Sequence, residues 1–216
     1  MDDMRSLFES IQEENERIAH GLDMMLGMAR QERFSVDLFP EQVNLEKLVR
    51  EVINKHKKEF IRYSIYPRME VLAGSTWVET DQKWMAFVID QLVSNAIKYT
   101  RVTHLDGDKQ LLIRIEEEAE AQGNANIHTD ANTIKLTVED YGVGIPKQDL
   151  PRIFEPFFTG ENGRLAPEST GMGLFLANRT CRELGHGLTV RSEPGQGTAI
   201  TVVFSTGAIT SGLIVK

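Results

Sequence analysis

The sequence is poor in cysteine. Cys181 is the only one among the 216 residues. A single thiol excludes an internal disulfide and any metal site built from several cysteines, and such sparing use is typical of proteins in a reducing compartment. We therefore expect Cys181 to be a small core residue and the chain, as given, to be cytoplasmic.

Long apolar runs and a basic surface are also missing. No run approaches the roughly 20 apolar residues that a membrane helix needs, and the first five residues lack the apolar core of a signal peptide. The 24 basic residues are scattered among 32 acidic ones, for a net charge of −8. This balance argues against nucleic acid as a partner. With 41% hydrophobic residues, the chain can bury one α/β core and carry a helical appendage.

The N-terminal segment has the pattern of one long amphipathic helix that ends before Phe39-Pro40. Its apolar residues recur at helical spacing and are Leu7, Ile11, Ile18, Leu22, Met25, Leu26 and Ala29. A lone amphipathic helix must bury its stripe, and its own domain, a missing partner helix or a second chain could each cover it.

The rest of the chain alternates between helical and strand patterns. Asn44 and Asp81 are expected to cap two helices, and residues 145–170 read as a long loop with a short helical turn near Asp149. The expected helices are 45–60, 82–99 and 171–184, and the expected strands are 61–71, 111–115, 133–138, 187–192 and 198–204. The strands 111–115 and 133–138 would form a hairpin with an extended tip, and the last two strands a second hairpin.

Four motifs carry residues suited to chemistry. In the first, residues 90–99 (DQLVSNAIKY), Gln91, Asn95 and Lys98 share one face of a helix. An amide oxygen can bind a hard cation such as Mg²⁺, and a nearby lysine offsets phosphate charge. An ordinary solvated helix face would show the same spacing, so this motif alone does not identify a binding site.

The second motif, residues 139–146 (EDYGVGIP), follows a strand and places an acid beside two glycines. The carboxylate of Asp140 can accept a hydrogen bond from an exocyclic amine, and Gly142 and Gly144 let the backbone approach a flat ring. A turn with incidental glycines is the alternative.

The third and fourth motifs lie in and after the long loop. Residues 153–158 (IFEPFF) place three aromatic side chains where they need burial, as a mobile lid or as a static plug. Residues 169–176 (STGMGLFL) are a glycine-rich entry to a helix, whose free N–H groups attract phosphate. No Gly-Lys-Ser/Thr follows and no strand precedes, so this is neither a Walker loop nor a dinucleotide fingerprint.

In this order and spacing, the motifs resemble the N, G1, F and G2 boxes of sensor histidine kinases, within the superfamily of gyrase, Hsp90 and MutL. The resemblance covers residues 40–204. The Gln91 position and the Ser-Thr-Gly-Met-Gly-Leu run are similar to the Bce-type kinases that work with antimicrobial-peptide transporters. The resemblance to sensor histidine kinases implies a Bergerat-type fold. This is an α/β two-layer sandwich of a mixed sheet and helices, preceded here by a helix from a dimerisation region.

The resemblance also implies roles for individual residues, with ATP and Mg²⁺ as cofactors. Asn95 would be the metal ligand, Lys98 the phosphate contact and Asp140 the acceptor for the adenine amine; Asn95, Lys98 and Gln91 would form the catalytic set. The remaining nucleotide contacts would be Tyr99, Gly142, Gly144, Ile145, Phe158, Thr170, Gly171, Met172, Gly173, Leu174 and Thr198.

No histidine in the chain fits the phosphoacceptor box of this family, in which an acid directly follows the histidine. The five histidines, His20, His56, His104, His128 and His186, are followed by Gly, Lys, Leu, Thr and Gly. We therefore interpret residues 1–39 as the C-terminal helix and linker of the dimerisation region, and residues 40–216 as the catalytic ATP-binding domain. The acceptor and the membrane segments are expected upstream.

The expected reaction is transfer of the γ-phosphoryl group of Mg-ATP to a histidine absent from this chain, for relay to a response regulator. Two alternatives stay open: a gyrase- or Hsp90-like ATPase, and a non-catalytic nucleotide-binding regulator. Against the ATPase, Gln91 stands where those relatives carry a glutamate, and a neutral amide is no general base. The implied partners are ATP, the acceptor helix, the response regulator, a second copy through the N-terminal helix and a transporter. The full-length protein is expected at the cytoplasmic face of the bacterial membrane.

Overall fold

The computed structural model describes residues 38–103, 109–118, 133–166 and 169–204. Contacts divide the chain into two units, Met1–Leu38 and Phe39–Lys216, and the described fold belongs to the second. The predicted N-terminal helix, His20, His104, His128 and the tip of the first hairpin lie outside the described residues.

The second unit contains a five-stranded mixed sheet with the order β2-β4-β5-β7-β6. Strands β2 and β4 are parallel, and the other neighbours are antiparallel. The strands are β2 (Ile65–Val71), β4 (Lys109–Glu118), β5 (Thr133–Asp140), β6 (Gly187–Glu193) and β7 (Gly197–Phe204). Both predicted hairpins are confirmed, with β4 against β5 and β6 against β7.

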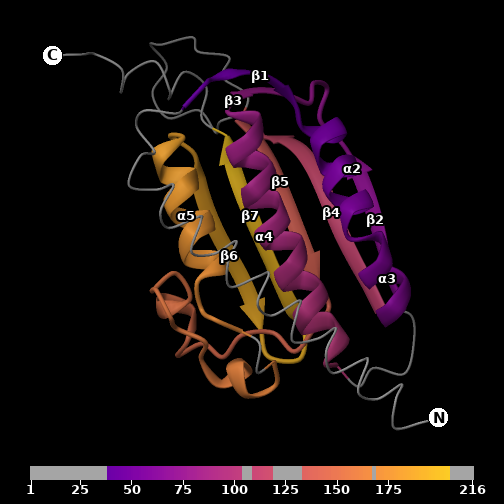
Figure 1. Ribbon diagram of the computed structural model, residues 1–216, viewed down its shortest axis with the longest axis vertical. Helices are drawn as coiled ribbons and strands as arrows, with labels where there is room; N and C mark the ends of the chain where they lie inside the picture. The colour runs from indigo at the N-terminus through magenta and orange to yellow at the C-terminus, as the bar shows by residue number, and fades with distance from the viewer. Residues whose placement is uncertain (1–37, 104–108, 119–132, 167–168, 205–216) are drawn as a thin grey trace, which may run out of the picture. The chain divides into compact units, whose positions relative to one another are not determined.

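Helices form the second layer on one face of this sheet, with α4 between α2 and α5 (Figure 1). The helices are α2 (Leu45–Lys55), α3 (Lys57–Tyr63), α4 (Gln82–Arg101) and α5 (Gly173–Glu183). Between the two layers lies a core of aliphatic side chains, and Cys181 is buried in it as expected. The predicted α/β two-layer sandwich is therefore confirmed.

The predicted caps begin their helices for the expected reason. The side chain of Asn44 accepts a hydrogen bond from the backbone N–H of Lys47 at 2.9 Å, and that of Asp81 accepts one from Trp84 at 3.0 Å. Each satisfies a backbone donor that the first turn leaves without a partner.

Several predicted boundaries were wrong. The helix expected over 45–60 is two helices that meet at His56, and α3 continues to Tyr63, so the next strand begins at Ile65 rather than at residue 61. Between α3 and β2 the chain turns at Ser64, whose backbone is in the left-handed region at φ 53°. The last helix begins at Gly173, two residues later than expected.

The sequence patterns also missed two short strands. β1 (Glu41–Asn44) and β3 (Trp77–Thr80) form a separate antiparallel pair at the end of the domain where α2 and α4 begin (Figure 1). Four residues are too few to establish a period of two, which explains the omission. The long loop contains the expected turn as η2 (Leu150–Arg152), and a second one, η3 (Glu161–Arg164), that was not predicted.

Candidate functional site

The floor of the candidate site is a polar stripe on α4. Gln91, Asn95 and Lys98 are half-buried and follow one side of the helix. The adjacent apolar side is completely covered, and its residues are Met85, Ile89, Leu92 and Ala96. The predicted division of this helix into a polar and an apolar face is therefore confirmed.

The N-terminal end of α5 lies directly against this stripe. A Cβ added to Gly173 would lie 2.7 Å from Oε1 of Gln91 and 3.8 Å from Nδ2 of Asn95. A side chain there would displace the amide of Gln91, so glycine lets the backbone of the fourth motif lie against the amides of the first. The first-turn N–H groups of α5 carry the partial positive charge that attracts phosphate. Met172 itself is fully buried, and its side chain serves the core.

Gly171 joins the start of α5 to the aromatic motif. Its φ is +69°, and a Cβ there would lie 2.6 Å from the backbone nitrogen of Phe158. The N–H of Phe157 donates to the carbonyl of Gly171 at 3.1 Å. Phe157 has a positive φ of 64°, and 68% of it is exposed. Phe154 and Phe158 are half-buried, so none of the three aromatic residues of this motif is fully buried, and the choice between a mobile lid and a static plug stays open.

Asp140 ends β5 as a buried carboxylate. Its Oδ1 accepts a hydrogen bond from the N–H of Gly142 at 2.9 Å. Burial raises the pKa of Asp140 to about 7, although hydrogen bonds from the backbone of Gly142 and Thr198 act to lower it. A Cβ on Gly142 would lie 2.7 Å from both Asp140 Oδ1 and the carbonyl oxygen of Tyr99. The second motif therefore packs against the C-terminal part of α4.

Ser192 organises the turn that follows, and the sequence analysis missed it. Its hydroxyl accepts from the N–H of Ile145 at 2.8 Å, donates to the carbonyl of Gly197 at 2.7 Å, and lies 2.9 Å from Oγ1 of Thr198. Gly144, at φ +68°, leaves no room for a Cβ beside the carbonyl of Glu193. The predicted hairpin could have indicated this contact, because its register places Ser192 opposite Thr198.

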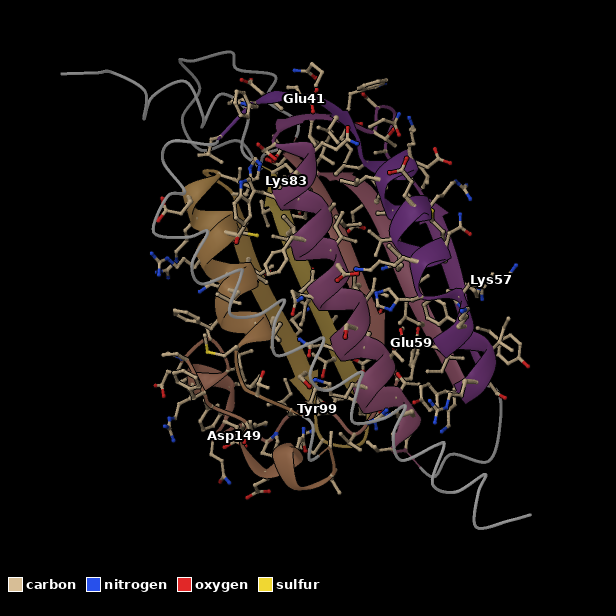
Figure 2. The ribbon with its side chains drawn as sticks, viewed as in Figure 1. Glu41, Lys57, Glu59, Lys83, Tyr99 and Asp149 are labelled. Carbon is tan, nitrogen blue, oxygen red and sulfur yellow. The ribbon has the colours of Figure 1, made fainter. Side chains whose placement is uncertain are left out.

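The segment 145–170, which we call the lid, has its described residues, 145–166 and 169–170, at the same end of the domain. Figure 2 shows Tyr99 near the end of α4 and Asp149 in the lid at that end. The hydroxyls of Tyr99 and Ser169 are 3.3 Å apart, and Nδ2 of Asn162 donates to the carbonyl of Gly144 at 2.6 Å. The guanidinium of Arg152 lies 4.2 Å from the ring centre of Phe158. Ile145, Phe158, Thr170 and Leu174 are half-buried around this region.

The structure thus brings all four motifs to one end of the helical layer. Within the described ranges there is no group of three or more His, Cys, Asp or Glu residues that could hold a metal ion. A metal at this site would depend on an amide such as that of Asn95 and on ligand phosphates, as the sequence analysis expects.

Comparison with known proteins identifies the family. Residues 80–207 match the family described as "Histidine kinase-, DNA gyrase B-, and HSP90-like ATPase". The chain belongs to this family. The sensor histidine kinase YxdK of Bacillus subtilis (strain 168) is 38% identical over 200 residues, which are 93% of this chain and 56% of YxdK. The sensor protein BceS of Halalkalibacterium halodurans is 34% identical over 185 residues, 85% of this chain and 49% of BceS.

These relatives define the place of the chain within the family. It is the ATP-binding domain of a sensor histidine kinase of the Bce-like subgroup, and it spans about half the length of the curated relatives it matches. The histidine kinase AdeS of Acinetobacter baumannii has the same fold, with a TM-score of 0.65 and 21% identity over 93% of this chain and 84% of the AdeS chain. No helix among the described residues is long and apolar enough to cross a bilayer.

Proposed function

We infer that this domain binds Mg-ATP between α4, the start of α5 and the end of β5, and transfers the γ-phosphoryl group to a histidine outside this chain. One observation carries the proposal: the glycine motifs press their backbone onto the polar side of α4. Gly173 meets Gln91 and Asn95, and Gly142 meets the carbonyl of Tyr99. Three separate segments therefore present N–H groups, amides and a carboxylate to one space.

The adenine end of this space is the buried pair of Asp140 and Thr198. The carboxylate would accept a hydrogen bond from the exocyclic amine of adenine, with Thr198 and the Gly142–Gly144 backbone beside the ring. Ser192 holds Ile145 and Thr198 together through its hydroxyl, so it would keep this wall in shape. ShkA, which has the same fold, has been solved in complex with AMPPNP, and this supports a nucleotide here.

The phosphate end is formed by α4 and α5. Thr170, Gly171 and Gly173 would place backbone N–H groups of the α5 start near the phosphates. Asn95 would ligate Mg²⁺ and Lys98 would offset phosphate charge. When bound, Mg²⁺ would neutralise charge on the phosphate oxygens. Gln91 lies against Gly173, and its amide is neutral. It would therefore orient groups by hydrogen bonding and would not activate water as a general base.

In the proposed reaction, an imidazole nitrogen of the acceptor attacks the γ-phosphorus while the bond from that phosphorus to the β–γ bridging oxygen breaks. ADP leaves, and the phosphoryl group stays on the imidazole. This domain contributes positioning and charge neutralisation, which carry most of the catalysis in such transfers.

The test is transfer in trans. With Mg-[γ-³²P]ATP, we expect acid-labile label on a separately added dimerisation fragment that carries the acceptor histidine. No label should appear on His20, and little phosphate should be released without the fragment. Transfer should be slow, because separate parts lose the high effective concentration of a tethered substrate.

Two controls define what would refute the proposal. Asn95→Ala should abolish transfer, since it removes the metal ligand, whereas Asn54→Ala on the far side of α2 should leave it intact. Label on His20 would overturn the interpretation of residues 1–39 as an acceptor-free dimerisation helix. Brisk phosphate release without acceptor would move the chain to the gyrase- and Hsp90-like ATPases.

For the full-length protein we propose further partners and a location. Residues 1–39 would form part of a dimerisation region that pairs two copies and precedes the catalytic domain, residues 40–216. The acceptor histidine, a response regulator and a transporter are proposed as partners at the cytoplasmic face of the membrane. The sensor names of YxdK, BceS and GraS, and their roughly doubled length, support this arrangement.

A further inference from the structure

A buried histidine ties α4 to the helices on the flank away from α5. His56, at the junction of α2 and α3, is only 9% exposed. Its Nε2 lies 2.8 Å from Oδ1 of Asp90 on α4, and its Nδ1 contacts the carboxylate of Glu59 on α3. The ammonium of Lys55 lies 2.8 Å from the same Asp90 oxygen. Apart from Asp90, the first residue of the first motif, the members of this group lie outside the four sequence motifs.

Geometry fixes the charge of the imidazole. Both ring nitrogens face carboxylates, which only accept hydrogen bonds, so both nitrogens must carry a proton. Burial acts to lower the pKa of His56, but hydrogen bonds to Asp90 and Glu59 outweigh it and raise the pKa to about 9. Burial likewise acts to raise the pKa of Asp90, and the hydrogen bonds from His56 and Lys55 lower it. The pair is therefore ionic at neutral pH.

The position of this pair on α4 links it to the functional stripe. Asp90 directly precedes Gln91 and stands five residues, about 7.5 Å along the axis, before Asn95. α4 contacts α2 and α3 on one flank and α5 on the other (Figure 1), and Figure 2 shows Glu59 at the α3 side of α4. On the α5 flank, a Cβ on Gly173 would lie only 2.7 Å from Oε1 of Gln91. A small sideways or rotational shift of α4 would change that contact.

We propose that His56 is a positioning residue of the nucleotide site: its bridge to Asp90 fixes the rotation and lateral position of α4, so that Gln91 and Asn95 face the start of α5. The bridge acts on the phosphate and metal end of the site. The adenine end, at Asp140, rests mainly on β5 and the β6–β7 hairpin, and it meets α4 only at the C-terminal part of that helix, near Tyr99. The inference rests on the proposed role of Asn95 in holding Mg²⁺.

The test separates the two ends of the site. ATP affinity is titrated with and without Mg²⁺, and the ratio of the two dissociation constants measures the metal-dependent gain. His56→Gln should reduce this gain by roughly three- to ten-fold, below the 10–100-fold typical of a group that directly supports a metal ligand. Metal-free ATP affinity, which depends on Asp140, should stay within about two-fold and also shows that the variant is folded.

Glu59→Gln is the matched control. It removes the negative charge beside Nδ1 of the same imidazole, but on α3, and so leaves the link to α4 in place; the metal-dependent gain at pH 7 should be unchanged. Asp90→Asn should reproduce the loss seen in His56→Gln. The double variant His56→Gln, Asp90→Asn can restore an uncharged hydrogen bond between the two positions, and it should recover part of the gain.

The pH dependence of the metal-dependent gain is a further test, because a contact that only stabilised the fold would not make this gain depend on pH. The groups facing the imidazole in the described residues are Asp90, Glu59 and, through Asp90, Lys55. In the wild type, the metal-dependent gain should fall as the pH rises through about 9, where the imidazole loses its proton. The fall should occur at lower pH in Glu59→Gln and be absent in His56→Gln.

The outcomes distinguish the two proposals. If Mg²⁺ gives the wild type no gain, or if Asn95→Ala keeps the full gain, the proposed metal site fails. If Asn95→Ala loses the gain while His56→Gln and Asp90→Asn both keep it, the positioning role is refuted. An equal loss of metal-free and metal-dependent affinity in both variants would also refute it, because the bridge would then support the whole fold.

Discussion

The two sides of the proposed nucleotide site, α4 and the lid, differ in how they are held in place. α4 is fixed by a continuous buried face, with Met85, Val88, Ile89 and Val93 at 0% exposure, and by neighbouring helices on both flanks. Among the described residues of the lid, Ile153 and Ala166 are the buried hydrophobic side chains, and the rest of this segment is held mainly by backbone hydrogen bonds and a few side-chain contacts. On one side of the proposed site, α4 is therefore fixed by the apolar core, and on the other side the lid is held mainly by hydrogen bonds.

Hydrogen exchange should show the largest difference between these regions. Amides in the middle of α4 should exchange only by global unfolding, which for a domain costs about 5–15 kcal/mol. Amides of residues 160–166 should open at a small fraction of that cost without nucleotide and become protected when Mg-ATP binds. Equal protection of both regions in the free protein would contradict a gating lid and favour a static plug.

Two leucine truncations sharpen the same contrast. Leu92→Ala, in the buried face of α4, should lower the free energy of unfolding by about 2–5 kcal/mol, through lost burial and the cavity left behind. Leu165→Ala in the lid, where half of the residue is exposed, should change it by no more than about 0.5 kcal/mol. Urea denaturation measures both, and comparable losses would mean that the lid belongs to the core.

At the adenine end, Asp140→Asn should weaken ATP binding more than GTP binding, because guanine lacks the amine at that position. A hydrogen bond to a charged group contributes about 1.5–3 kcal/mol, so the loss should be roughly ten-fold or more. Calorimetric titration with both nucleotides tests this. Unchanged ATP affinity in a folded variant would remove Asp140 from the site.

The pH dependence of ATP binding should report the same carboxylate. With a pKa of about 7, Asp140 is mostly protonated at pH 6 and mostly ionised at pH 8. ATP affinity should therefore fall by up to about ten-fold from pH 8 to pH 6, because the ionised carboxylate is a stronger acceptor for the amine than the protonated acid. The Asp140→Asn profile serves as reference and should lack this component; identical profiles would contradict the assignment.

The same shift has the opposite effect on the stability of the free domain. The folded-state pKa lies above that of an unfolded chain, about 3.9, so the contribution of Asp140 is complete below that value. This contribution is lost as the pH rises towards and through 7. Bound nucleotide should offset the loss, which thermal unfolding with and without ATP can measure.

Local patterns in the sequence determined most of the framework. The side chains of Asn44 and Asp81 cap helices from one residue away, and the spacing of Gln91, Asn95 and Lys98 sets them on one side of α4. Both kinds of signal act within a few residues, so they can be read without knowing the fold. The four motifs likewise indicated the family before their geometry was known.

Only the tertiary structure determined how distant residues meet. His56 and Asp90 are 34 positions apart, and Ser192 and Ile145 are 47 apart, so no local period connects them. The helix predicted over residues 45–60 also breaks at His56, and the buried contact of that residue joins the junction of α2 and α3 to Asp90 on α4. Local patterns thus indicated the four motifs, and the pairing of α4 with α5 decided how closely Gly173 approaches Gln91 and Asn95.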